Sequence, residues 1–60
     1  MNNTEKLTRV DESINGLHTI NVKLTGIDPI YDVTIRKQLM TTIESLMEWH
    51  QWLRNNINAT

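Results

Sequence analysis

The stretch Gly26-Ile27-Asp28-Pro29 decides the fold, because it combines the signals that end one helix and begin another. Glycine just past a helix end adopts the left-handed conformation without strain. Aspartate is a preferred N-cap, and proline is favoured at the first helical position, where its missing N–H needs no partner. These four residues predict a turn over 26–29 that separates two helices.

The segment after the turn carries apolar side chains at alternating steps of three and four residues, which is the spacing of one helix face. This pattern predicts a helix from about 29 to about 56. Its first turn is less favourable, because Val33, Thr34 and Ile35 have branched side chains that are stiff in helices. The predicted face consists of Leu39, Ile43, Leu46, His50, Leu53 and Ile57, and it is widened by Met40 and Met47.

The segment before the turn shows the same spacing, which predicts a helix from about 3 to about 25. Asn21 takes the one polar position on this face, where it would fix the register of packing. The alternation of apolar and polar residues over 19–25 also fits a β-strand, which would need a pairing strand from another chain. The apolar positions of the predicted helix are Leu7, Val10, Ile14, Leu17 and Leu24.

Together these patterns predict an all-α fold, a hairpin of two antiparallel helices that forms a single domain over 1–60. Folding the helices back on each other would place Leu24 near Val33 and Val10 near Leu46. Sixty residues without cysteine bury little apolar surface, so such a chain usually needs self-association to be stable. We therefore expect the hairpins to assemble into an oligomeric helical bundle through the apolar residues outside the seam, namely Ile20, Ile35, Trp49 and Trp52.

Composition excludes several classes of function. Six Lys and Arg against seven Asp and Glu give a net charge of −1, which leaves no excess of positive charge for duplex nucleic acid. No secretion signal and no apolar run of membrane length is visible, so we expect neither export nor a membrane partner. The chain has no cysteine nucleophile, no glycine-rich phosphate loop and no histidine pair at ligand spacing. We therefore expect a protein that is not an enzyme and has no cofactor or metal.

Trp49, His50 and Trp52 form the densest unusual cluster. Two indoles three residues apart on a helix can stack on a base or anchor a partner. Packing at an interface is the simpler interpretation and the one we favour. His50 takes a position on the apolar face, where a histidine is more often satisfied by a hydrogen bond than used as a ligand.

Lys23, Arg36 and Lys37 are cations placed on either side of the predicted turn. With the backbone N–H groups at the start of the second helix, they can hold a phosphate group. They fit equally well on an ordinary solvated surface.

The run from Thr41 through Ile43, Met47 and Glu48 to Trp49 resembles a stretch found late in phage anti-CBASS cyclic-nucleotide sponges. The Leu7-Thr8 pair near the start, followed by Ile14-Asn15, is similar to the first helix of that family. Thr4 stands where the family carries an aromatic residue.

This resemblance implies small helical subunits that form compact oligomers, commonly hexamers, and trap cyclic di- or trinucleotides without degrading them. In the host cytoplasm such trapping blocks an anti-phage defence. The resemblance implies phosphate contacts from Lys23, Arg36 and Lys37, and base pockets lined by Thr4, Thr8, His18 and Thr19.

Two alternative functions remain open. The first is a small protein-interaction module or inhibitor that lays its Trp and Met strip into a groove on a host protein. The second is a structural subunit of a virion or a larger assembly.

Overall fold

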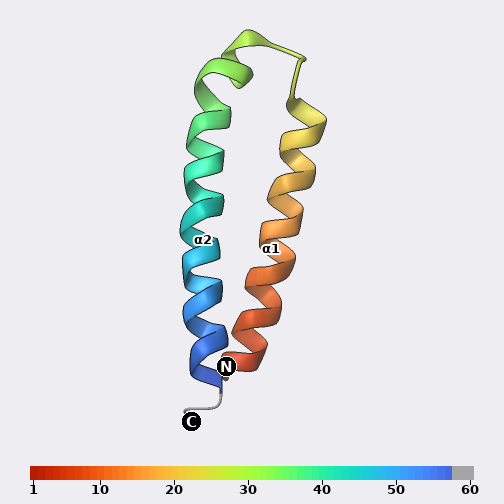
Figure 1. Ribbon diagram of the computed structural model, residues 1–60. Coiled ribbons are helices and arrows are strands. Elements are labelled where there is room, and N and C mark those ends of the chain that lie inside the picture. Colours follow the sequence, from red (N-terminus) through yellow and green to blue (C-terminus); the bar gives the residue numbers. More distant parts are fainter. Residues whose placement is uncertain (58–60) are drawn as a thin grey trace.

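The computed structural model describes residues 1–57 and consists of two long antiparallel helices joined by a bend (Figure 1). Helix α1 spans Asn3–Leu24 and helix α2 spans Arg36–Asn56. One π-helical turn, η1 (Tyr31–Ile35), leads directly into α2. The predicted all-α hairpin is confirmed. The segment that also fitted a strand is helical up to Leu24, so that alternative is wrong.

Helix α1 begins and ends at residues whose chemistry explains its limits. The side chain of Asn2 accepts a hydrogen bond of 2.8 Å from the Glu5 N–H, which satisfies one free donor of the first turn. At the other end Gly26 has a φ of 86°, the left-handed conformation that glycine adopts most easily. The predicted role of Gly26 as a helix stop is therefore confirmed.

The bend is organised by two aspartates. Asp28 Oδ1 accepts a hydrogen bond of 2.7 Å from the Ile30 N–H, and Pro29 stands at the first helical position, as the sequence predicts. Asp32 Oδ1 accepts a second bond, of 3.0 Å, from the Gly26 N–H. This second bond ties the start of the returning helix to the end of α1.

The π-turn η1 changes which side chain faces α1 near the bend. In a regular helix Tyr31 and Leu39 would point about 80° apart, because eight steps of about 100° exceed two full turns by that angle. A π-turn inserts about one extra residue, which brings the two side chains onto the same side. Tyr31 is buried, while Val33 is 74% exposed. The predicted contact between Leu24 and Val33 is therefore wrong, because Tyr31 takes the inward position.

Tyr31 also fixes the register of the two helices. Its hydroxyl donates a hydrogen bond of 2.7 Å to Asn21 Oδ1, across the top of the seam. At the opposite end Asn3 Nδ2 donates to the Asn56 carbonyl oxygen at 3.4 Å. The partly buried bond between Tyr31 and Asn21 contributes about 1 kcal/mol to the stability of the hairpin. The predicted register role of Asn21 thus has a structural basis.

The core of the hairpin is the seam between α1 and α2. Every apolar position predicted for this seam is buried or half-buried, apart from Val33 and Met47. Few side chains are fully enclosed, however. Among the described residues, the buried ones are Val10, Tyr31, Ile43 and Leu53.

A single hairpin leaves much of its apolar surface in water. Its accessible surface is 4618 Å², whereas a compact protein of 7.0 kDa exposes about 4,000 Å². The predicted exposure of residues outside the seam is confirmed for Ile20, Ile35, Trp49 and Trp52. Val22, Ile27, Ile30 and Met47 are also largely exposed. Patches of this kind usually mark an interaction surface.

Candidate functional site

The residues predicted to bind a cyclic nucleotide are spread along the whole hairpin. Thr4 lies in the first turn of α1 and Lys23 in its last, which places them about 28 Å apart at 1.5 Å per residue. Arg36 and Lys37 open α2 at the same end as Lys23 (Figure 1). The fold therefore gathers the three cations near the bend but leaves Thr4 at the far end of the same hairpin.

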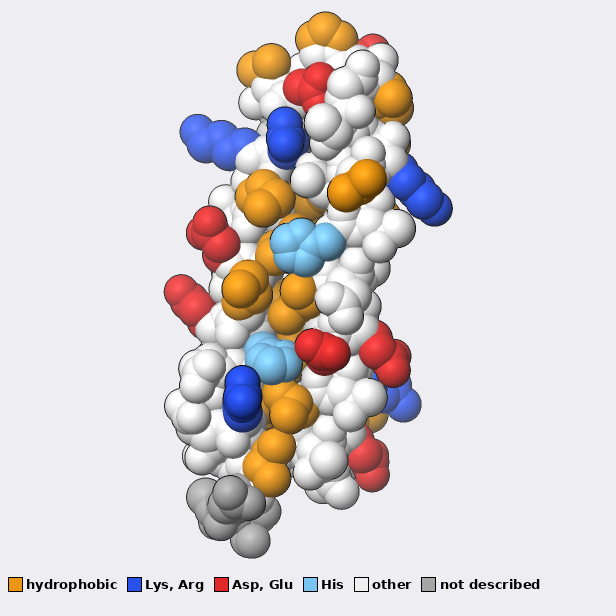
Figure 2. Space-filling view, turned by 45° about the vertical axis from the view of Figure 1, so that its right-hand side comes forward, with side chains coloured by type: hydrophobic (Ala, Val, Ile, Leu, Met, Phe, Trp, Pro, Cys, Tyr) orange, Lys and Arg blue, Asp and Glu red, His pale blue; other side chains and the backbone are white. Residues whose placement is uncertain are grey.

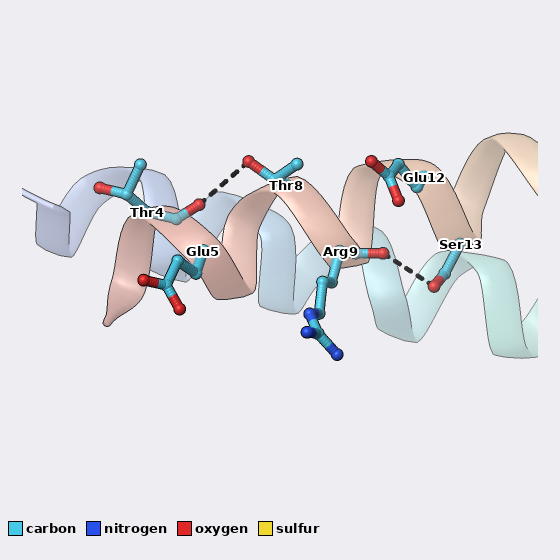
Figure 3. A pocket seen from close by; sticks show the side chains of 6 residues that line it. All are labelled: Thr4, Glu5, Thr8, Arg9, Glu12 and Ser13. Atoms are coloured by element: carbon cyan, nitrogen blue, oxygen red, sulfur yellow. Dashed lines mark hydrogen bonds between the residues drawn. The ribbon is translucent and has the colours of Figure 1, made fainter. Parts of the chain in front are cut away.

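Thr8 lies one turn beyond Thr4, and both line an open hollow of about 730 Å³ (Figure 3). All the side chains in this hollow come from α1, so no second element closes it. Thr8 Oγ1 donates back to the Thr4 carbonyl oxygen at 3.2 Å. The carboxylates of Glu5 and Glu12 outnumber the one cation in the same hollow, Arg9, so its net negative charge disfavours a phosphate.

His18 and Thr19, the other two predicted pocket residues, lie in the last two turns of α1 and are exposed. Thr19 Oγ1 donates to the Asn15 carbonyl oxygen at 3.0 Å, so its hydroxyl proton is engaged within the helix. Thr19 lies one turn before Lys23 on the same side of α1, but neither His18 nor Thr19 lies in the hollow with Thr4 and Thr8. One hairpin alone does not assemble the predicted pocket.

The cations at the bend are free to meet a ligand. Lys23, Arg36 and Lys37 are exposed, and within residues 1–57 none of them forms an ion pair. The two acidic residues of the bend, Asp28 and Asp32, accept hydrogen bonds from the backbone instead. This arrangement leaves a small excess of positive charge at the end of the hairpin.

A different site lies on one flank of the hairpin, where both helices form a groove of about 190 Å³. Its floor is apolar, with Val10 and Leu46 from the seam, and the indole of Trp49 forms one wall. Lys6 and Arg9 stand at its edge. We call this site the Trp49 groove, and it is lined by Met1, Lys6, Arg9, Val10, Ser13, Leu46 and Trp49.

The Trp49 groove has the features of a binding site for an apolar side chain with a negative neighbour. Trp49 remains 47% exposed, so a partner can cover its indole. Two cations and no carboxylate occur among the described residues that line the groove. Sequence reasoning singled out Trp49 but missed Lys6 and Arg9. The one signal in the sequence that could have identified Lys6 and Arg9 is their position four residues and one residue before Val10, because that spacing places both side chains beside the seam.

The opposite flank carries a polar hollow of about 410 Å³. His50 Nε2 lies 3.5 Å from Asp11 Oδ1 there, and Leu7 and Arg54 line the same hollow. His50 is half-buried beside this carboxylate, which agrees with the predicted structural role. Sequence spacing alone gave no sign of this pair, because the two residues are on different helices.

Over residues 1–57, no three His, Cys, Asp or Glu side chains come close enough together to hold a metal ion. No helix in this part of the chain has the length and apolar character needed to cross a membrane.

Comparison with protein-family models, curated proteins and solved structures finds no match to this chain. The resemblance to cyclic-nucleotide sponges therefore stays a prediction. The features of this chain that can support a function are the Trp49 groove, the cations at the bend and the exposed apolar residues.

Proposed function

We propose that this hairpin is a non-catalytic interaction module that binds another protein through the Trp49 groove. The observation that supports this function is the half-exposed indole of Trp49 beside an apolar floor formed by both helices. A tryptophan in such a setting is the kind of residue that dominates binding energy at interfaces. The groove needs no second copy, in contrast to the divided nucleotide site.

The chemistry of the groove suggests the class of partner. A segment with one large apolar side chain would fill the space between Val10, Leu46 and Trp49. Carboxylates on either side of that anchor would pair with Lys6 and Arg9, which line the groove without an acidic neighbour in it. An acidic amphipathic helix satisfies both conditions.

Site-specific photo-crosslinking in living cells tests this function. A photoreactive residue in place of Ser13, which lines the groove and is exposed, is expected to crosslink to one partner protein. The same residue in place of Glu48, which is exposed and lies outside the groove, serves as the control. Equal crosslinking from both positions, or none from Ser13, would contradict the proposal.

Sequestration of a cyclic oligonucleotide is a second candidate, favoured by the exposed cations at the bend. In this case Lys23, Arg36 and Lys37 from several copies would surround the phosphates, with the threonines of neighbouring hairpins on the bases. Isothermal titration with a panel of cyclic di- and trinucleotides is expected to show binding that is lost when Arg36 and Lys37 become Glu. The absence of heat with every member of the panel would eliminate this candidate.

A further inference from the structure

The flank opposite the Trp49 groove is a second unpartnered surface. Figure 2 shows the histidine side chains on one side of the hairpin, together with a hydrophobic strip that runs along the seam. Residues seven apart lie two turns apart on the same side of a helix, which links Asp11 to His18 and Arg54 to Met47 and Met40. We call this surface the histidine face, made up of Asp11, His18, Met40, Met47, His50 and Arg54.

The charges on the histidine face differ between its two edges. On the α1 edge Asp11 is 61% exposed, and within residues 1–57 the one basic side chain close to its carboxylate is His50, at 3.5 Å. On the α2 edge Arg54 is exposed, as is Arg36 five turns nearer the bend, and neither forms an ion pair within the same residues. Consider a second copy placed so that its α2 lies over α1 of the first copy. Arg54 of the second copy then lies near Asp11 of the first, and Asp11 of the second copy lies near Arg54 of the first. The surface is therefore complementary to itself.

The dimensions of the hairpin match those of a stable dimer interface. Its principal extents are 46 × 15 × 13 Å, so one flank offers roughly 700 Å² to a second copy. Two such flanks bury roughly 1,400 Å² in total, which falls within the range of specific protein interfaces. The histidine face also presents the apolar side chains of Met40 and Met47, which adapt readily to a new packing environment.

The Trp49 groove is less suited to a second copy. Its lining contains the cations Lys6 and Arg9 and no carboxylate among the described residues, so a matching groove offers no complementary charge. The histidine face contains both signs of charge. The two flanks therefore favour different occupants.

We propose that two copies of this chain pack histidine face to histidine face, with both bends at the same end. The two-fold axis runs parallel to the helices, and α1 of each copy lies on α2 of the other, which gives a four-helix bundle. Met47 of each copy is enclosed near the centre of the interface. The Trp49 grooves remain open on the outer sides, so this dimer forms whether or not a partner protein binds there.

Sedimentation over micromolar to submillimolar concentrations tests which face associates. The wild-type chain is expected to be a dimer, and Met47→Lys is expected to weaken it by at least about 100-fold, because the ammonium group would be buried without a partner. Met47 is 53% exposed, so the hairpin itself keeps its helicity, which circular dichroism verifies. The matched control is Trp52→Lys, which is 55% exposed and lies about 140° further around α2. The Trp52→Lys variant is expected to remain a dimer.

A wild-type chain that sediments as a monomer at every concentration would overturn the proposal. The proposal would also be overturned if Trp52→Lys dissociates the dimer and Met47→Lys does not, because that result would assign self-association to the other side of α2.

The orientation of the two copies is tested separately. Asp11→Arg and Arg54→Glu are each expected to be monomeric alone, because like charges then face each other, and to form a heterodimer when mixed. The chain contains no cysteine, so Thr25→Cys introduces a single spin-label site beside the bend. Labels much closer together than the 46 Å length of one hairpin would support bends at the same end. A separation near that length, or a mixture that stays monomeric, would contradict the proposed arrangement.

Discussion

Leu53→Ala is expected to remove a large share of the free energy of unfolding of the hairpin. Leu53 is 0% exposed and one of two side chains in the described part of the chain that are completely enclosed. Truncating such a leucine costs about 2–5 kcal/mol, because the lost apolar contacts are added to the cost of the cavity. A domain of this size has a total stability of about 3–9 kcal/mol. One substitution therefore removes a large share of it.

Loss of packing also melts the helices themselves, since most of the stability of a helix in a protein comes from the packing of its apolar face. Urea titration followed by circular dichroism at 222 nm measures the effect. The midpoint is expected to fall by at least about 2 M, given a slope of about 1 kcal/mol per M for a small domain. Trp52→Ala is the control, because it removes a larger but exposed side chain from the same helix. If both variants unfold at the same urea concentration, the seam is not the core.

Trp49→Ala is expected to abolish partner binding while leaving the hairpin folded. Removal of an anchoring indole at an interface typically costs about 2 kcal/mol or more, which is about a 30-fold loss of affinity. Its effect on folding is small, because nearly half of the Trp49 side chain is already in water. Crosslink yield from the photoreactive residue at position 13 reports the loss whichever protein the partner is.

Trp52→Ala provides the matched comparison for this experiment. Trp52 is as large and as exposed as Trp49, but it does not line the groove. Crosslinking from position 13 is expected to persist in this variant. Equal losses from the two substitutions would mean that the whole tryptophan strip, and not the groove, holds the partner.

The helical hairpin was predictable because its signals are local. The three-and-four spacing identified every seam residue from Leu39 to Leu53, and Gly26 and Asp28 have the predicted conformation and capping bond. The burial of Tyr31 was not predictable in this way. It depends on one π-turn, which rotates the chain relative to α2 and breaks the regular spacing.

The candidate site was only partly predictable, because it depends on how the two helices are rotated against each other. Trp49 stood out by its residue type alone. Lys6 and Arg9 belong to the other helix, and only the packed hairpin places them beside that indole. The same holds for Asp11 and His50, which are far apart in sequence and 3.5 Å apart in space.

The residues predicted for the nucleotide pocket are divided between the two ends of the hairpin. Thr4 and Lys23 belong to opposite ends of α1, so one copy cannot use both on one small ligand. Only an assembly of several hairpins can bring such residues together.

We expect a hairpin with so small a core to perform its function through association with other chains. Native mass spectrometry of the protein, gently purified from the cells that make it, is the decisive measurement of this association. We expect species well above the 7.0 kDa of one chain, containing a second copy, a partner protein or both. A folded 7.0 kDa species with nothing bound, at every concentration sampled, would contradict it.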